Sequence, residues 1–172
     1  MKYEFINELQ VDASADDVWA IFGSPNLSKV FLELLPSMVE SKCILEGDGG
    51  LGTVFRVVYR PGYVPHTYKE KIVTIDHDKR LKEVQQIEGG HLEMGFTSYM
   101  KSGQILEIKD CNNSCIIRSI TKYEIKDDLE VMNNNVSSLI TGLDTLVAFA
   151  RAIPKYIQEQ KKNSASVANH NK

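Results

Sequence analysis

Apolar residues recur with a period of two in the first two thirds of the chain and with a period of three to four near its C-terminus. The alternation from Tyr3 to Val11 predicts a first strand with one apolar face. Between residues 38 and 126, short alternating or β-branched runs are separated by Gly, Asp, Asn and Pro, which is typical of consecutive strands. We therefore expect six further strands, over residues 39–45, 53–60, 66–75, 81–88, 92–108 and 114–125.

Two short helices are expected between the first two strands. Ser14 precedes Asp16 and Asp17, and a hydroxyl followed by acids is typical of an N-cap and the first turn of a helix. This helix should end at residues 23–25, which contain glycine and proline. A second helix is expected over residues 26–35, before the next proline.

The last third of the chain has the pattern of a long amphipathic helix. Apolar residues recur at steps of three and four from Val136 to Ile157, which predicts a helix of about 30 residues with one stripe facing a core. Pro154 is expected to bend this helix or to lift its final turns. Residues 162–172 lack apolar periodicity and are rich in Asn, Ser and Lys, so we expect a disordered tail after a single domain over residues 1–161.

Together these elements predict an α+β domain. A seven-stranded, curved antiparallel sheet would wrap around the long C-terminal helix, with the two short helices between the first and second strands. The sheet must curve, because only the long helix has an apolar stripe that can cover so many strands. Curved sheets packed on one helix seldom fill completely, so we expect an internal cavity that holds a ligand.

Composition and charge narrow the class of function. The 172 residues include 20 Lys and Arg and 23 Asp and Glu, for a formal net charge of −3, and the basic residues form no stripe, so nucleic-acid binding is not expected. No apolar run reaches the roughly 18 to 20 residues of a membrane span, and no signal-peptide core follows Met1, so we expect a cytoplasmic protein without a membrane partner. Cys43, Cys111 and Cys115 are odd in number and poorly spaced for disulfides or zinc, so we expect reduced thiols and no metal.

Several strings of residues, together with the order of elements, resemble a known family. The glycine-rich loop over residues 46–53 lacks the Gly-Lys-Ser/Thr ending of a nucleotide loop and leads into a strand, so a tight connection is the favoured interpretation. It looks like the signature loop of the birch-pollen-allergen superfamily, specifically of the class-10 pathogenesis-related proteins. Residues 65–71 (PHTYKEK), 80–82 (RLK) and 87–92 (IEGGHL) resemble the norcoclaurine synthase branch, and the similarity covers nearly the whole chain.

This resemblance implies a Pictet–Spengler condensation of an arylethylamine such as dopamine with an aldehyde, in plant alkaloid biosynthesis and without a cofactor. At the matching positions, it implies that Lys82 is the general acid and Glu70 the base, with Tyr68 forming hydrogen bonds or shaping the mouth of the cavity. A desolvated lysine and a carboxylate suit these two proton transfers. The further residues that we expect to bind substrate are His66, Phe96, Met100 and Lys101.

Strand alternation places His66, Tyr68 and Glu70 on one face but does not say whether that face is buried. A three-residue turn over residues 76–78 would place Lys82 diagonal to Glu70, so that both side chains enter one cavity. A two-residue turn would shift the register and turn Lys82 to the opposite face. Periodicity leaves both registers open, and the resemblance favours the inward lysine.

One position departs from the synthase branch. That branch carries an aspartate at the pocket entrance, after the string that here reads Thr97 to Met100, and this chain has Lys101 there. A lysine near a cationic amine would repel it by roughly 1 to 4 kcal/mol at 4 Å, unless its ammonium points into solvent. The substrate pair or the reaction then differs.

The alternative function is a non-catalytic carrier of small apolar plant ligands such as cytokinins, flavonoids or alkaloids, which many members of the wider family resemble. The ribonuclease activity attributed to this family ranks last, because no pair of acid and base histidines is visible. We expect a monomer or a weak dimer.

Overall fold

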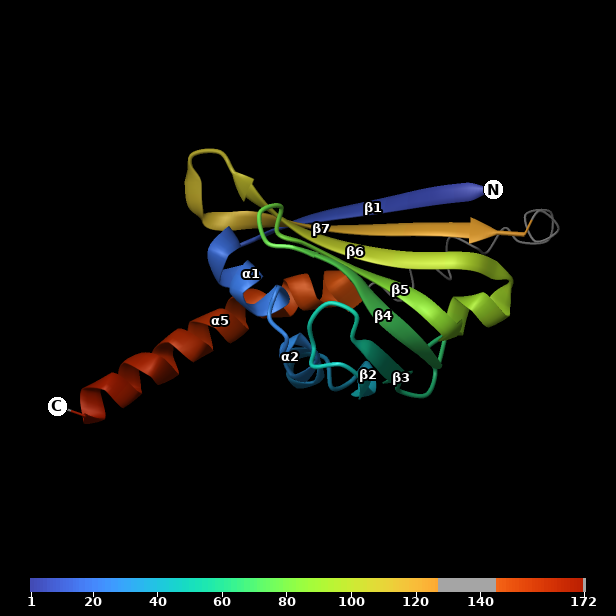
Figure 1. Cartoon of the computed structure of the whole chain (residues 1–172). Coiled ribbons are helices and arrows are strands. Elements are labelled where there is room, and N and C mark those ends of the chain that lie inside the picture. The colour runs from blue at the N-terminus through green and yellow to red at the C-terminus, as the bar shows by residue number, and fades with distance from the viewer. Residues whose placement is uncertain (127–144, 172) are drawn as a thin grey trace.

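The computed structural model describes residues 1–126 and 145–171, and its main feature is a strongly curved sheet with helices against its concave side (Figure 1). The strands are β1 (Lys2–Val11), β2 (Val39–Glu46), β3 (Val54–Tyr59), β4 (Thr67–Asp76), β5 (Leu81–Gly89), β6 (Phe96–Ile108) and β7 (Cys111–Ile125). The helices are α1 (Ala15–Phe22), α2 (Leu27–Leu34) and α5 (Thr145–His170), and a 3-10 helix, η1 (Gly90–Met94), precedes β6.

The sheet is a seven-stranded antiparallel sheet in the order β1-β7-β6-β5-β4-β3-β2, so β1 and β2 form its two edges. The predicted fold class is therefore confirmed. The first part of the expected long helix, residues 136–144, lies outside the described residues. Among those that are described, none of the helices combines the length and the apolar character that a membrane span requires.

Helix α1 begins as its sequence predicts. The Ser14 side-chain oxygen accepts a hydrogen bond from the backbone N–H of Asp17 at 3.1 Å, and Asp16 and Asp17 lie in the first turn. The acids stabilise this end because they face the positive end of the helix dipole. Val18 and Phe22 form the buried face, which packs on the core.

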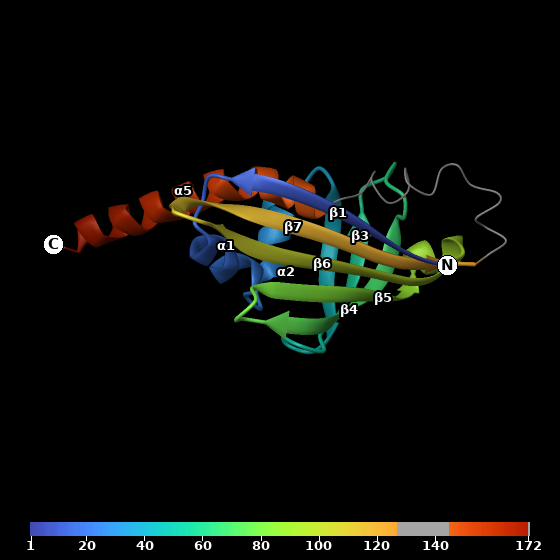
Figure 2. The ribbon, with the colours of Figure 1, turned by 90° about the horizontal axis from the view of Figure 1, so that it is seen from above.

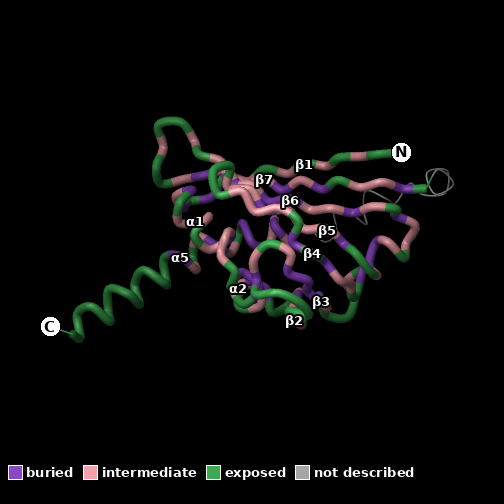
Figure 3. Tube along the Cα trace, viewed as in Figure 1, coloured by how far each residue is buried: buried purple, intermediate pink, exposed green. Residues whose placement is uncertain are grey.

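The hydrophobic core lies between the concave face of the sheet and α5 (Figure 3). Phe149 and Ile153 of α5 are fully buried, and Cys115 and Ile117 of β7 cover the facing side. These residues recur every four positions on the helix and every two on the strand, as one buried face of each element requires.

Helix α5 extends further toward the C-terminus than we expected. It continues through Pro154 and past residue 161 to His170, where we predicted a disordered tail. Residues 158–171 are all exposed, and Figure 2 shows this end of the helix projecting beyond the sheet. The missing apolar periodicity predicted the lack of burial, but it does not prevent a helix in a segment with Ala, Lys and Gln.

The segment before β6 also differs from the prediction. We expected one strand over residues 92–108, but β6 begins only at Phe96, after η1. Gly89 and Gly95 flank η1 with φ values of 72° and 95°, conformations that interrupt a strand. The apolar residues at 92, 94 and 96 alternate as in a strand, although residues 90–94 form a 3-10 helix, and this alternation caused the wrong start.

The glycine-rich loop makes a tight connection between β2 and β3, as expected. Gly49 has a φ of 98°, and its N–H donates a hydrogen bond to the Thr53 hydroxyl at 2.9 Å. A Cβ atom on Gly49 would collide with the backbone of Pro25 in the turn between α1 and α2. Glycine is therefore required where this loop approaches the helices.

Candidate active site

A cavity lies between the concave face of the sheet and helices α1, α2 and α5. Its volume is about 90 Å³, and part of it opens to solvent. Side chains such as those of Phe22, Leu27, Phe31 and Leu146 make most of its wall apolar, as is usual in small-molecule sites. The wall also carries six residues with ionisable side chains: Lys42, Tyr59, Tyr68, Glu70, Lys82 and Lys101.

A β-bulge in β4 sets the register that brings Lys82 into this cavity. Near the turn, Ile75 pairs with Lys82, but beyond the bulge Ile72 pairs with Val84 and Glu70 with Gln86. The extra residue lies between Ile72 and Thr74. Since the side-chain period is two, this insertion places Lys82 on the same face of the sheet as Ile72 and Glu70.

Neither register that we considered from the sequence is the observed one. Both assumed a turn of two or three residues, whereas Asp76 pairs with Leu81 and leaves residues 77–80 in the turn. Compared with the three-residue turn, the observed turn shifts the register by an odd number of residues, which alone would turn Lys82 outward. The bulge shifts the register by one more residue, so Lys82 faces inward. Glu70 and Lys82 consequently share the cavity, although they are not diagonal neighbours.

The side chain of Lys82 ends among backbone carbonyls. Lys82 is 4% exposed, and its Nζ donates hydrogen bonds to the carbonyl oxygens of Phe22 at 3.1 Å and Ser24 at 3.4 Å. These carbonyls lie at the C-terminal end of α1, where the helix dipole favours a cation. Burial, and then the positive charge of Lys42, lower the pKa of Lys82 to about 8, while Glu70 opposes this shift.

Glu70 forms an ion pair that sequence analysis missed. Its Oε1 lies 2.7 Å from Nζ of Lys42 on β2, and the two side chains are 8% and 17% exposed. Lys42 was missed because alternation puts it on the face opposite to Val39, the buried residue of that strand. A bulge between Val39 and Ser41 turns both Val39 and Lys42 toward the cavity.

Tyr68 lines the same cavity, and its hydroxyl lies 3.1 Å from the hydroxyl of Tyr59. Burial raises the pKa of Tyr68 well above its usual value. The phenol therefore keeps its proton and can donate a hydrogen bond at any pH at which the protein works.

Of the four residues expected to bind substrate, only Lys101 lines the cavity, on β6 and half-buried. Met100 points to the convex face, since neighbouring strand residues alternate and Lys101 points inward. Phe96 is buried in a separate cluster with Tyr99 and Ile125. His66 is exposed and precedes β4, so the alternation of that strand does not extend to it. Met100, Phe96 and His66 therefore do not line this cavity, and their role in substrate binding stays a prediction.

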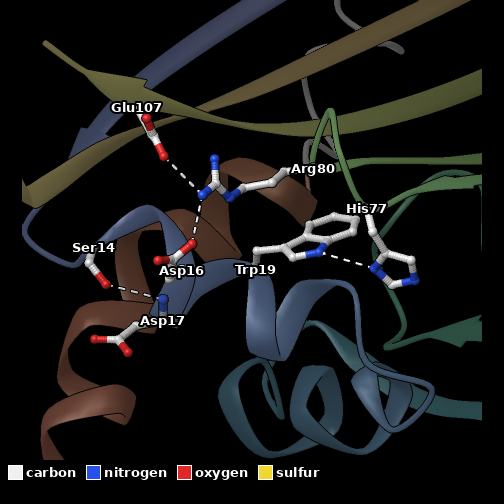
Figure 4. A network of polar contacts seen from close by, with 7 residues as sticks. All are labelled: Ser14, Asp16, Asp17, Trp19, His77, Arg80 and Glu107. Atoms are coloured by element: carbon white, nitrogen blue, oxygen red, sulfur yellow. Dashed lines mark hydrogen bonds and ion pairs between the residues drawn. The ribbon is translucent and has the colours of Figure 1, made fainter.

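Side-chain contacts hold the turn that precedes Lys82 against α1 (Figure 4). Arg80 contacts Asp16 of α1 at 2.6 Å and Glu107 of β6 at 2.9 Å. Trp19 Nε1 donates a hydrogen bond to Nδ1 of His77 at 3.3 Å. The same helix thus holds the turn through its side chains and Lys82 through its C-terminal carbonyls.

Within residues 1–126 and 145–171, no group of His, Cys, Asp and Glu side chains has the arrangement of a metal site. The acid–base groups of the cavity are the features that define its chemistry. A curved sheet closed by a long helix, with buried acid and base groups in an apolar hollow, defines a small-molecule-binding protein of the helix-grip class.

The sequence model of the pathogenesis-related protein Bet v 1 family matches residues 1–159, and the chain belongs to this family. S-norcoclaurine synthase of Thalictrum flavum subsp. glaucum is 42% identical over 160 residues, 93% of this chain and 73% of that protein. Norbelladine synthase of Narcissus pseudonarcissus is 37% identical over 164 residues, 95% of this chain and 96% of that protein. The solved structure of norcoclaurine synthase from Thalictrum flavum in complex with dopamine and hydroxybenzaldehyde superimposes with a TM-score of 0.81, at 40% identity, over 92% of this chain and 88% of that chain.

Proposed function

We propose that this protein is a Pictet–Spengler condensing enzyme of the norcoclaurine synthase type, which joins an arylethylamine such as dopamine with an aldehyde in plant alkaloid biosynthesis. The similarity to synthases over nearly the whole chain supports the reaction. The observation that carries the proposal is the burial of Lys82, with its pKa of about 8, in the same apolar cavity as the carboxylate of Glu70.

The reaction would begin when the neutral amine attacks the aldehyde carbon and forms a carbinolamine. Lys82 donates a proton to the carbinolamine hydroxyl, which leaves as water and produces an iminium ion. A lowered pKa makes the Lys82 ammonium a stronger acid than an ordinary lysine, while most of it remains protonated at neutral pH. The Tyr68 phenol, which keeps its proton, would hydrogen-bond to the substrate near the mouth of the cavity.

Ring closure then requires a base. The aromatic carbon of the amine substrate attacks the iminium carbon, and Glu70 removes the ring proton to restore aromaticity. Transfer of a proton back to Lys82 completes the cycle. Both steps move protons between substrates and side chains, and Glu70 and Lys82 supply one acceptor and one donor.

A second candidate function is the non-catalytic binding of a small apolar plant metabolite. The observation that favours it is Lys101, which lines the cavity at the position where the synthase branch carries an aspartate. A cation at this place disfavours an ammonium ligand. The carrier would bind its ligand without turnover.

Incubation of the purified protein with dopamine and 4-hydroxyphenylacetaldehyde tests the proposal. We expect one product enantiomer to form faster than in buffer, and Glu70→Gln to reduce the rate by about 10²- to 10⁴-fold. Glu88→Gln is the matched control, because Glu88 is an exposed glutamate paired with Lys69. Racemic product at the buffer rate would overturn the enzyme and favour the carrier.

A further inference from the structure

We propose that Lys42 is a positioning residue of this active site, which holds the Glu70 carboxylate in place and supplies a positive charge that makes the Lys82 ammonium a better proton donor. The inference rests on the proposed function, since it assigns these two groups their roles as base and acid. Lys42 comes from the edge strand β2, away from the strands that carry the other two residues.

The position of Lys42 is defined by three contacts. Its ammonium forms the 2.7 Å ion pair with Glu70, and it lies over the rings of Phe55 and Phe31 at 4.9 and 5.4 Å from their centres. The two rings hold the ammonium through cation–π attraction and keep water away from it. The ion pair is therefore largely shielded from water at the wall of the cavity.

Even the partial burial of this ion pair costs free energy that folding alone does not require. Taking two charges out of water is expensive, and an apolar pair of similar volume is often at least as stable. The neighbouring Lys69–Glu88 pair has nearly the same length, 2.8 Å, but its side chains are 25% and 63% exposed. A lysine–glutamate ion pair thus forms on the outer face of β4 and β5 with little loss of hydration free energy. This indicates that the pair inside the cavity has a role other than stability.

For Glu70, the consequence is a carboxylate that is held in place. Lys42 contacts Oε1, so the ring proton of the substrate would be accepted at Oε2. A charge-assisted hydrogen bond of this length restricts the carboxylate to one orientation. Correct placement of a base relative to a reacting carbon is a large part of its catalytic effect.

For Lys82, the consequence follows from the charges that face it. These are Lys42 from β2, Glu70 from β4 and Lys101 from β6, together with the carbonyl dipoles at the end of α1. Lys42 lowers the pKa of Lys82 by like-charge repulsion, and Glu70 raises it. Removal of Lys42 would abolish the repulsion and free the full charge of Glu70. Both changes raise the pKa of Lys82 and make it a weaker acid.

Lys42→Met tests the inference, since methionine keeps most of the apolar stem and removes the charge. We expect the titration of the Lys82 side chain, followed by NMR of labelled lysine, to move to higher pH, and kcat to fall by about tenfold or more. The alkaline limb of the pH profile of kcat/KM should move in the same direction. Lys42→Arg should largely restore both values. Lys69→Met, which breaks the exposed pair, is the matched control and should change neither.

An unchanged Lys82 titration in Lys42→Met would overturn the inference. If that variant does not fold because Glu70 loses its partner, the double variant Lys42→Met/Glu70→Gln replaces it, with Glu70→Gln alone as its reference. The NMR titration needs no substrate. If the wild-type protein does not condense the substrates but the Lys82 titration still moves in Lys42→Met, the proposed function fails. The effect of Lys42 on Lys82 then still stands.

Discussion

The ammonium of Lys82 lies 3.1 Å from the carbonyl oxygen of Phe22, the last residue of α1. The last carbonyls of a helix have no partner within the helix, so the lysine satisfies one of them. A short N-terminal helix thereby fixes the side chain of a residue 60 positions later in the chain. Two of the three ammonium protons of Lys82 are thus held by backbone carbonyls, which leaves the third for a substrate in the cavity.

The pKa of Lys82 predicts how activity depends on pH. The acid form is needed, so kcat/KM should fall as pH rises through about 8, the pKa of Lys82. In Lys82→Arg the guanidinium does not titrate in this range, and the decline near this pH should vanish from whatever activity remains. Both proteins use the same amine, so its own ionisation cancels in the comparison. Identical alkaline limbs in the two proteins would contradict the role of Lys82 as acid.

Lys82→Met should make the protein more stable at neutral pH. The pKa of Lys82 is about 8 in the folded state and 10.5 in the reference state, so the unfolded chain binds more protons between these values. The free energy of unfolding of the wild type therefore rises with pH in this window, as the charged form becomes less populated. We expect the variant to gain up to about 3 kcal/mol at pH 7, less the loss of two hydrogen bonds, and no advantage above about pH 10.5.

Urea unfolding of wild type and variant at several pH values measures this difference. Lys79→Met is the matched control, because Lys79 lies in the preceding turn with its side chain 71% exposed, and it should change stability little at any pH. A variant that is less stable than wild type at pH 7 would show that the hydrogen bonds to the α1 carbonyls outweigh the cost of burial.

The ion pairs of Arg80 should stabilise the protein, whereas its positive φ should destabilise it. Its φ is 47°, a region that costs a non-glycine residue roughly 1 to 2 kcal/mol, yet the side chain bridges Asp16 and Glu107. We expect Arg80→Ala to lower the free energy of unfolding by about 1 kcal/mol, since it loses both ion pairs and keeps the strain. Arg80→Gly loses the same pairs but relaxes the backbone, so its loss should be smaller.

Thermal unfolding of the two Arg80 variants and of Arg118→Ala checks this prediction. Arg118 forms a surface pair with Glu8 at 2.6 Å on a strand of ordinary backbone conformation, and we expect little change there. Equal stabilities of the alanine and glycine variants would rule out backbone strain at position 80. Raised KM or lowered kcat in the glycine variant would show that the contact of this turn with α1 also positions Lys82.

Local patterns predicted most of the fold. The Ser14 cap, the strand boundaries and the buried stripe of α5 follow from interactions between residues a few positions apart, and they are found close to where the sequence places them. Errors arose where a local period continued beyond its element, as at η1, or where exposure was taken for disorder, as after residue 161. Among the site residues, Lys82, Glu70 and Tyr68 were named by resemblance, and all three line the cavity.

Only the tertiary structure decided which side chains meet. Bulges in β4 and β2 turn Lys82 and Lys42 inward, and a one-residue change in either would reverse the faces. Alternation along a single strand carries no information about such insertions, because they are set by pairing with a distant strand. The contact between Lys42 and Glu70, 28 residues apart, therefore had no local signature. The sequence determined the helices and strands through short-range interactions. The pairing of the strands determined which charged side chains face the cavity.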